Sequence, residues 1–193
     1  MNNICVFCGS SHGNEPIYTA QAQTLGKLMA KKNKTLIYGG GKVGLMGAIA
    51  DAVMDNGGNV VGVIPDFLMK KEVGHLGLSE LLVVRSMHER KQKMAELADG
   101  FVAMPGGFGT LEELGEILTW VQLGLIKKPV GLLNVNGFYD HLLLQMDHMV
   151  KQGFLKPQNR KLVINITQAE DVLPLLESHT FDGYSIWDDL NKT

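Results

Sequence analysis

The chain has 193 residues, of which 45% are hydrophobic and 20% are charged, and its formal net charge is −2. These values are typical of one folded domain of ordinary size and argue against an extensively disordered chain. The negative charge and the lack of a basic stripe argue against nucleic-acid binding. No apolar run approaches the ~20 residues of a membrane span.

The two cysteines, Cys5 and Cys8, are three residues apart at the first apolar run of the chain. Residues at this spacing on a strand point to opposite faces, so the pair is not expected to bind zinc or form a redox site. With no structural disulfide and no secretory segment after Met1, we expect a reducing, cytoplasmic compartment.

Short, nearly continuous apolar runs alternate with longer helical patterns along the chain. This alternation predicts a single doubly wound, Rossmann-like α/β domain, in which a parallel sheet carries helices on both faces. The domain would span residues 1–193, with a short C-terminal tail from about residue 181. The predicted strands are Ile4–Phe7, Thr35–Tyr38, Asn59–Ile64, Leu81–Val84, Phe101–Met104, Val130–Leu133 and Leu162–Ile166. The predicted helices are Ile17–Lys32, Leu45–Asn56, Met87–Ala98, Leu111–Leu123, Phe138–Gln152 and Ala169–Glu177.

Three of the loops that follow strands are rich in glycine or small residues. They span residues 8–11, 39–47 and 105–110, and they provide Ser10, Gly40 and Gly41 as candidate substrate contacts. Glycine lets backbone amides approach a ligand, and a helix start just beyond adds unpaired amides and a positive dipole end. The third loop, Pro105-Gly-Gly-Phe-Gly-Thr110, is the strongest candidate for binding a phosphate. The alternative is that these glycines only make tight turns and close packing.

The second loop also fits the G-x-G-x-x-G pattern of dinucleotide-binding domains, at Gly39, Gly41 and Gly44. That pattern expects an acidic residue at the end of the following strand. The only candidate here is Asp66, which lies beyond Pro65. An NAD oxidoreductase is therefore weakly supported.

Two charged residues stand out because they fall on apolar helix faces. Arg90 lies in the first turn of its predicted helix, where Ser86 and Glu89 form a capping-box pattern. An arginine that faces the sheet there is costly to bury, and an anionic ligand or a carboxylate nearby would offset that cost. The alternative is that its stem packs on the sheet and its head group extends to solvent. Glu113 is either the capping partner of Thr110 or a catalytic carboxylate beside the phosphate loop, and helical periodicity does not separate the two.

Several motifs in order resemble the LOG ("Lonely Guy") family over roughly residues 3–165. They are Pro105–Glu113, which fits the family's PGGxGTxxE motif, Met87–Lys91, Val6–Ser11, Tyr38–Gly41, Gly44–Gly47 and Lys128–Asn134. Members of this family are cytokinin riboside 5′-monophosphate phosphoribohydrolases, often mislabelled as lysine decarboxylases. The resemblance implies hydrolysis of AMP or N6-modified AMP to free base and ribose 5-phosphate, by a homodimer that needs no cofactor and no metal.

The resemblance also assigns roles to individual residues. Arg90 and Glu113 take the catalytic positions. The implied substrate contacts are Glu72, Arg90, Lys91, Gly107, Phe108, Gly109, Thr110, Leu111, Glu112, Glu113 and Thr119. Phe108 replaces a tyrosine that is common in the family, and the region around Glu72 departs most from the family pattern.

Other classes of function would use the same loops. A non-catalytic nucleotide carrier of similar fold would bind and release its ligand unchanged. A pyridoxal-phosphate decarboxylase is poorly supported because nothing marks a Schiff-base lysine.

Overall fold

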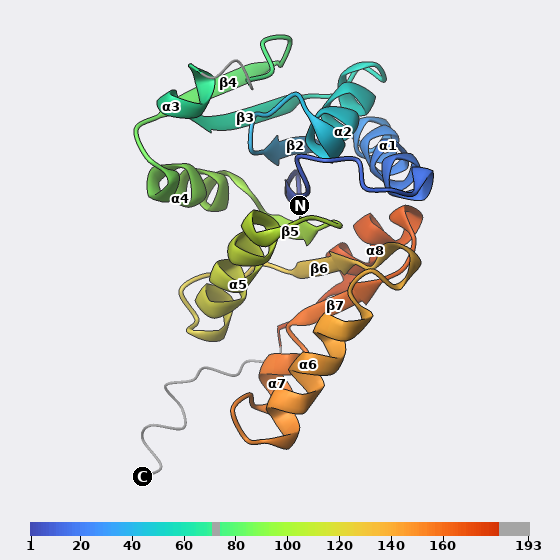
Figure 1. Ribbon diagram of the computed structural model, residues 1–193, viewed down its shortest axis with the longest axis vertical. Coiled ribbons are helices and arrows are strands. Elements are labelled where there is room, and N and C mark those ends of the chain that lie inside the picture. Colours follow the sequence, from blue (N-terminus) through green and yellow to red (C-terminus); the bar gives the residue numbers. More distant parts are fainter. Residues whose placement is uncertain (71–73, 182–193) are drawn as a thin grey trace.

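The computed structural model describes residues 1–70 and 74–181. Within these ranges the chain forms a seven-stranded, all-parallel sheet in the order β4-β3-β2-β1-β5-β6-β7, with helices on both faces (Figure 1). The predicted Rossmann-like α/β fold is confirmed. The strands are β1 (Asn3–Phe7), β2 (Thr35–Tyr38), β3 (Val60–Pro65), β4 (Glu80–Val84), β5 (Gly100–Ala103), β6 (Val130–Leu133) and β7 (Val163–Ile166).

Longer helices connect most successive strands, as right-handed crossovers between parallel strands require. They are α1 (Pro16–Lys31), α2 (Gly44–Met54), α4 (Met87–Leu97), α5 (Phe108–Gln122) and α6 (Asp140–Lys151), and a further helix, α8 (Val172–Ser178), follows β7. The short elements α3 (Asp66–Met69), α7 (Pro157–Arg160), η1 (Val135–Gly137) and η2 (Ala169–Asp171) were not predicted from the sequence as separate elements. Each is at most four residues long, which is too short to show a helical period.

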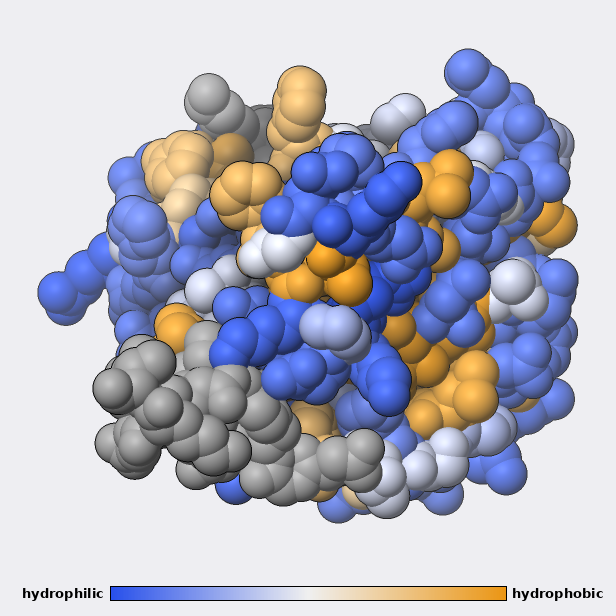
Figure 2. Space-filling model, turned by 90° about the horizontal axis from the view of Figure 1, so that it is seen from below, coloured by the Kyte–Doolittle hydropathy of each residue, from blue (hydrophilic) through white to orange (hydrophobic). Residues whose placement is uncertain are grey.

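The apolar core is divided by the sheet into two layers. One buried cluster joins the sheet to α1, α2 and α8, and the other joins it to α4, α5 and α6. Cys5 belongs to the second cluster and Cys8 to the first, and both are free thiols. The prediction that the two cysteines face opposite sides of the sheet is therefore confirmed. Seen from below the view of Figure 1, the surface is largely hydrophilic, with apolar patches between polar residues (Figure 2).

One helix start differs from the prediction in a way that matters for the site. Helix α5 begins at Phe108, not at Leu111, and its N-cap is Gly107. Thr110 therefore lies inside the helix, and the proposed capping box between Thr110 and Glu113 does not form. The expected cap of α4 is present, since Ser86 Oγ accepts from the Glu89 amide at 3.1 Å, but the Glu89 carboxylate accepts from the Arg85 amide instead of that of Ser86.

Strands β2 to β4 are added on one side of β1, and β5 to β7 are added on its other side. In open α/β sheets a ligand-binding crevice forms at such a switch point, here between β1 and β5. The loops after these two strands are joined by a hydrogen bond from the Gly9 amide to the Pro105 carbonyl at 3.0 Å. The start of α2 is attached to the same place, because the Leu45 amide donates to the Gly9 carbonyl at 3.1 Å. The three glycine loops of the sequence therefore meet at one edge of the sheet.

Candidate active site

The start of α5 is built to leave its first amides accessible. Its N-cap is Gly107, which has no side chain to cap them. A Cβ placed at Gly107 or Gly109 would meet nothing within 4 Å among the described residues. The backbone there is open to a ligand, and the helix dipole places partial positive charge at the same point. A phosphate group fits this environment.

The neighbouring glycines, in contrast, are packed tightly against other backbone. A Cβ at Gly44, where φ is +60°, would collide with the backbone of Ser10 and Ser11. A Cβ at Gly106 would collide with the side chain of Thr110, which is buried. These two glycines serve the close approach of the loops, so for them the packing interpretation of the sequence holds.

A buried ion pair joins α4 to α5. Arg90 Nη1 donates to Glu113 Oε1 at 2.7 Å, and both residues are only 8% exposed. Arg90 Nε donates to the carbonyl of Val63, within β3, at 3.1 Å. The guanidinium also lies against Gly39, where any Cβ would collide with it. The head group of Arg90 does not extend to solvent; it finds a carboxylate instead.

Burial acts on the acid more strongly than the arginine does. Desolvation raises the pKa of Glu113, and the nearby charge and hydrogen bond of Arg90 lower it, leaving the pKa above its ordinary value. Such a perturbed carboxyl group beside a ligand-binding loop is typical of catalytic sites. The same burial raises the pKa of the Cys5 and Cys8 thiols, so neither is activated as a nucleophile.

Lys91, next to Arg90 on α4, pairs with two other carboxylates of α5. Its Nζ donates to Glu112 Oε1 and lies 3.1 Å from Glu116 Oε2. Burial lowers the pKa of Lys91, but the hydrogen bonds to Glu112 and Glu116 outweigh it and leave the pKa raised. The sequence placed Lys91 and Glu112 in the site but did not single out Glu116. Its alignment with Glu112, one turn earlier on the helix, was the available signal.

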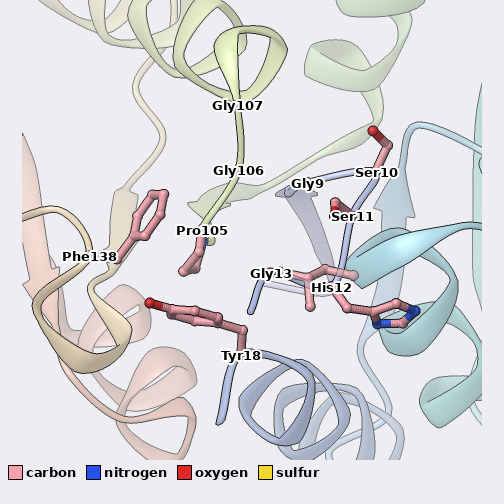
Figure 3. Close-up of a pocket in the computed structure, with 11 residues that line it drawn as sticks. Gly9, Ser10, Ser11, His12, Gly13, Tyr18, Pro105, Gly106, Gly107 and Phe138 are labelled. Atoms are coloured by element: carbon pink, nitrogen blue, oxygen red, sulfur yellow. The ribbon is translucent and has the colours of Figure 1, made fainter. Parts of the chain in front are cut away.

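A pocket of about 280 Å³ opens beside the loop of residues 105–110 (Figure 3). The aromatic rings of Tyr18 and Phe138 lie on one side of it, edge to face with centroids 5.9 Å apart, and Ser10 and Ser11 lie on the other. Gly106 and Gly107 form its boundary with α5. Neither Arg90 nor Glu113 is among its lining residues, so the pocket and the ion pair are separate features of the site. The ion pair is the candidate reactive centre, because it brings a buried carboxylate and a guanidinium together.

The other predicted contacts are spread around this centre. Ser10 is exposed at the pocket, while Gly40, at φ +73°, and Gly41 lie after β2, where Gly41 forms an isolated bridge with Gly74. Phe108 and Leu111 are exposed on the first turns of α5. Thr119 is further along α5, and its hydroxyl donates to the Gly115 carbonyl at 2.7 Å. Glu72 lies outside the described residues.

Among residues 1–70 and 74–181, no group of three or more His, Cys, Asp or Glu side chains is placed to hold a metal ion. In the same part of the chain, no helix has the length and apolarity needed to cross a membrane.

Solved structures of similar fold include a molybdenum cofactor binding protein from Rippkaea orientalis, at a TM-score of 0.70 and 22% identity, covering 92% of this chain and 96% of that one. The molybdenum cofactor carrier protein of Chlamydomonas reinhardtii gives a TM-score of 0.69 at 19% identity, covering 91% of this chain and 95% of that one. At these identities the likeness shows the fold alone.

Sequence comparison finds relatives of much higher identity. A cytokinin riboside 5′-monophosphate phosphoribohydrolase of Arabidopsis thaliana is 45% identical over 194 aligned positions, which cover 98% of this chain and 89% of the relative. An enzyme of the same name from Oryza sativa subsp. japonica is 47% identical, covering 96% of this chain and 78% of the relative. Residues 46–176 also match the family described as "possible lysine decarboxylase". The chain therefore belongs to the LOG family of phosphoribohydrolases, the group that this older description covers.

Proposed function

We propose that this protein hydrolyses the N-glycosidic bond of AMP-type nucleoside 5′-monophosphates, including N6-modified cytokinin nucleotides. The products are the free base and ribose 5-phosphate. The observation that carries the proposal is the buried pair of Arg90 and Glu113, held next to an uncapped, glycine-rich helix start. The names of the relatives from Arabidopsis thaliana and Oryza sativa support the same reaction.

The 5′-phosphate is the anchor of the substrate in this proposal. The first amides of α5, from Gly107 to Thr110, and the Thr110 hydroxyl bind it, together with the positive end of the helix. Anchoring the phosphate fixes the position of the ribose, and positioning of this kind can lower a reaction barrier by several kcal/mol. The remaining predicted contacts, from Ser10 to Thr119, surround the nucleotide.

The chemistry is the departure of a base from C1′. As the bond from C1′ to the base nitrogen breaks, its electron pair leaves with the base, and positive charge develops at C1′ and the ring oxygen. The Glu113 carboxylate, placed beneath the ribose, stabilises that charge or orients the water whose oxygen bonds to C1′. The water loses a proton and the base gains one, so the reaction is balanced without metal or cofactor.

Arg90 has two roles in this scheme. Its contact with Glu113 opposes the effect of burial and favours the ionised carboxylate. Its bond to the Val63 carbonyl fixes the direction from which it reaches Glu113, and therefore fixes the carboxylate itself. The guanidinium is also available to the ribose or phosphate of a bound nucleotide.

A second candidate is a nucleotide carrier that releases its ligand unchanged, because proteins named as cofactor carriers share the fold. Incubation of the purified protein with AMP, followed by chromatography, separates the two functions. Hydrolysis yields adenine and ribose 5-phosphate in equal amounts, whereas a carrier returns only AMP. A decarboxylase that uses pyridoxal phosphate would show the visible absorption of its cofactor.

We further propose a cytoplasmic homodimer. Phe108 is 93% exposed at the start of α5, and Val83 is exposed on the edge strand β4. A second subunit would cover these side chains, and aromatic residues such as Phe108 are enriched in subunit interfaces. Light scattering coupled to gel filtration gives the mass in solution, and a mass near 21.1 kDa would contradict the dimer.

A further inference from the structure

Lys91 is held on α4 by two carboxylates that come from successive turns of α5. Its side chain is 9% exposed, and its ammonium contacts both Glu112 and Glu116. The two carboxylates differ in their access to solvent, since the side chain of Glu112 is 54% exposed and that of Glu116 is 26% exposed. Glu116 is thus the more enclosed partner of Lys91.

The pairing of charges across the two helices is uneven. Arg90 and Lys91 of α4 face Glu112, Glu113 and Glu116 of α5, so two cations meet three carboxylates. Glu112 and Glu116 are four residues apart, and like charges at that spacing repel each other unless a cation lies between them. Lys91 supplies that cation, and its raised pKa keeps it protonated.

We propose that Glu116 is a positioning residue for Lys91. This inference rests on the proposed function, in which Lys91 contacts the nucleotide near the start of α5. Glu116 lies one helical turn further from that start than Glu112. When the substrate anion approaches the ammonium, the more enclosed Glu116 keeps Lys91 in place to meet it.

The test is Glu116→Gln, which removes the charge and keeps the size of the side chain. Calorimetry with ribose 5-phosphate measures binding without turnover, and steady-state kinetics with AMP separates KM from kcat. We expect binding about tenfold weaker and KM about tenfold higher, as for the loss of one charge-assisted hydrogen bond, with kcat changed by less than about twofold. In a Lys91→Ala background, Glu116→Gln should have no further effect.

The matched control is Glu96→Gln, which neutralises an exposed carboxylate of α4 paired only with Lys93 and Gln92 in the described structure. It should leave binding and KM unchanged. Wild-type affinity in Glu116→Gln, or an effect that persists without Lys91, would overturn the proposal. Should Glu116→Gln fail to fold, Glu116→Asp retains the charge but shortens the reach, and unchanged binding in that variant also overturns it.

The proposed function has its own test, independent of the role of Glu116. It is wrong if the wild-type protein releases no adenine from AMP. In that event AMP is not consumed and becomes the calorimetric probe. The comparison of wild type with Glu116→Gln then still decides the role of Glu116.

Discussion

Two hydrogen bonds fix the Arg90 guanidinium. Its Nε donates to the Val63 carbonyl oxygen at 3.1 Å, and its Nη1 donates to Glu113 Oε1 at 2.7 Å. Val63 belongs to β3 and Glu113 to α5, so Arg90 fixes the position of the Glu113 carboxylate relative to the sheet. A carboxylate held in this way can act on a substrate without first paying the entropy of becoming ordered.

The first prediction concerns Glu113 itself. Glu113→Gln keeps an amide oxygen that can accept from Arg90 but cannot carry the negative charge. We expect adenine release from AMP to fall by at least ~100-fold, the scale at which a positioned acid–base group contributes. Chromatographic assay of adenine measures this, and circular dichroism checks that the fold is retained. Turnover close to that of the wild type would return Glu113 to a purely structural role.

The second prediction concerns its partner. Arg90→Ala leaves a buried carboxylate without its cation, so we expect a loss of about 3–5 kcal/mol in the free energy of unfolding as well as the loss of base release. Urea denaturation and the adenine assay measure the two effects. Arg85→Ala, which removes an exposed arginine just before the same helix, is the control and should change neither. Equal behaviour of the two variants would contradict the assignment.

The sequence was enough to predict the strand–helix alternation, because strands buried on both faces are nearly continuous in apolar residues. It also placed Cys5 and Cys8 on opposite faces, since side chains alternate along a strand. The predicted start of α5, Leu111, was three residues too late, because Thr110 and Glu113 have the spacing of a capping box. A spacing pattern alone does not exclude a glycine N-cap three residues earlier.

The contacts across α4 and α5 were harder to predict. Arg90 and Glu113 are 23 residues apart, and their meeting depends on how α4 and α5 pack against the same face of the sheet. The burial of Lys91 depends on the same packing, which no local pattern encodes. The sequence could identify Arg90 as a charge that needed a partner, but it left open whether that partner was a ligand, solvent or Glu113.

The third prediction tests the phosphate anchor from the side of the substrate. If the start of α5 binds the 5′-phosphate, adenosine loses the group that positions its ribose. We expect kcat/KM for AMP to exceed that for adenosine by at least ~100-fold. Parallel assays of adenine release on both compounds are sufficient, and comparable values would show that the helix start does not hold the phosphate.

The fourth prediction tests the same anchor from the side of the protein. Gly109 has open space where a Cβ would be, so Gly109→Ala should fold normally and gain about 0.4–1 kcal/mol in stability. Its methyl group, however, would stand where the phosphate approaches the amides, and we expect KM for AMP to rise about tenfold or more. Gly115→Ala, also in open space but deeper in α5, should stabilise the protein without changing KM. The idea fails if the two variants have the same KM.

The last prediction follows from the raised pKa of Glu113. Because burial places this pKa above the ordinary value of about 4.3, the carboxylate needed for catalysis is lost at a higher pH than an ordinary glutamate would lose its charge. The acid limb of the kcat/KM profile for AMP, which reports the ligand-free protein, should therefore lie above that value. The effect on stability has the opposite sense. The folded state holds the proton more tightly than the unfolded state, so the contribution of Glu113 to stability is fully present below the unfolded pKa and is lost as pH rises through the folded pKa. Urea denaturation of the wild type and Glu113→Gln across this range should show the wild type losing stability relative to the variant as pH rises. An acid limb at or below the ordinary value, or a stability difference that changes in the other direction, would mean that Arg90 outweighs burial at this site.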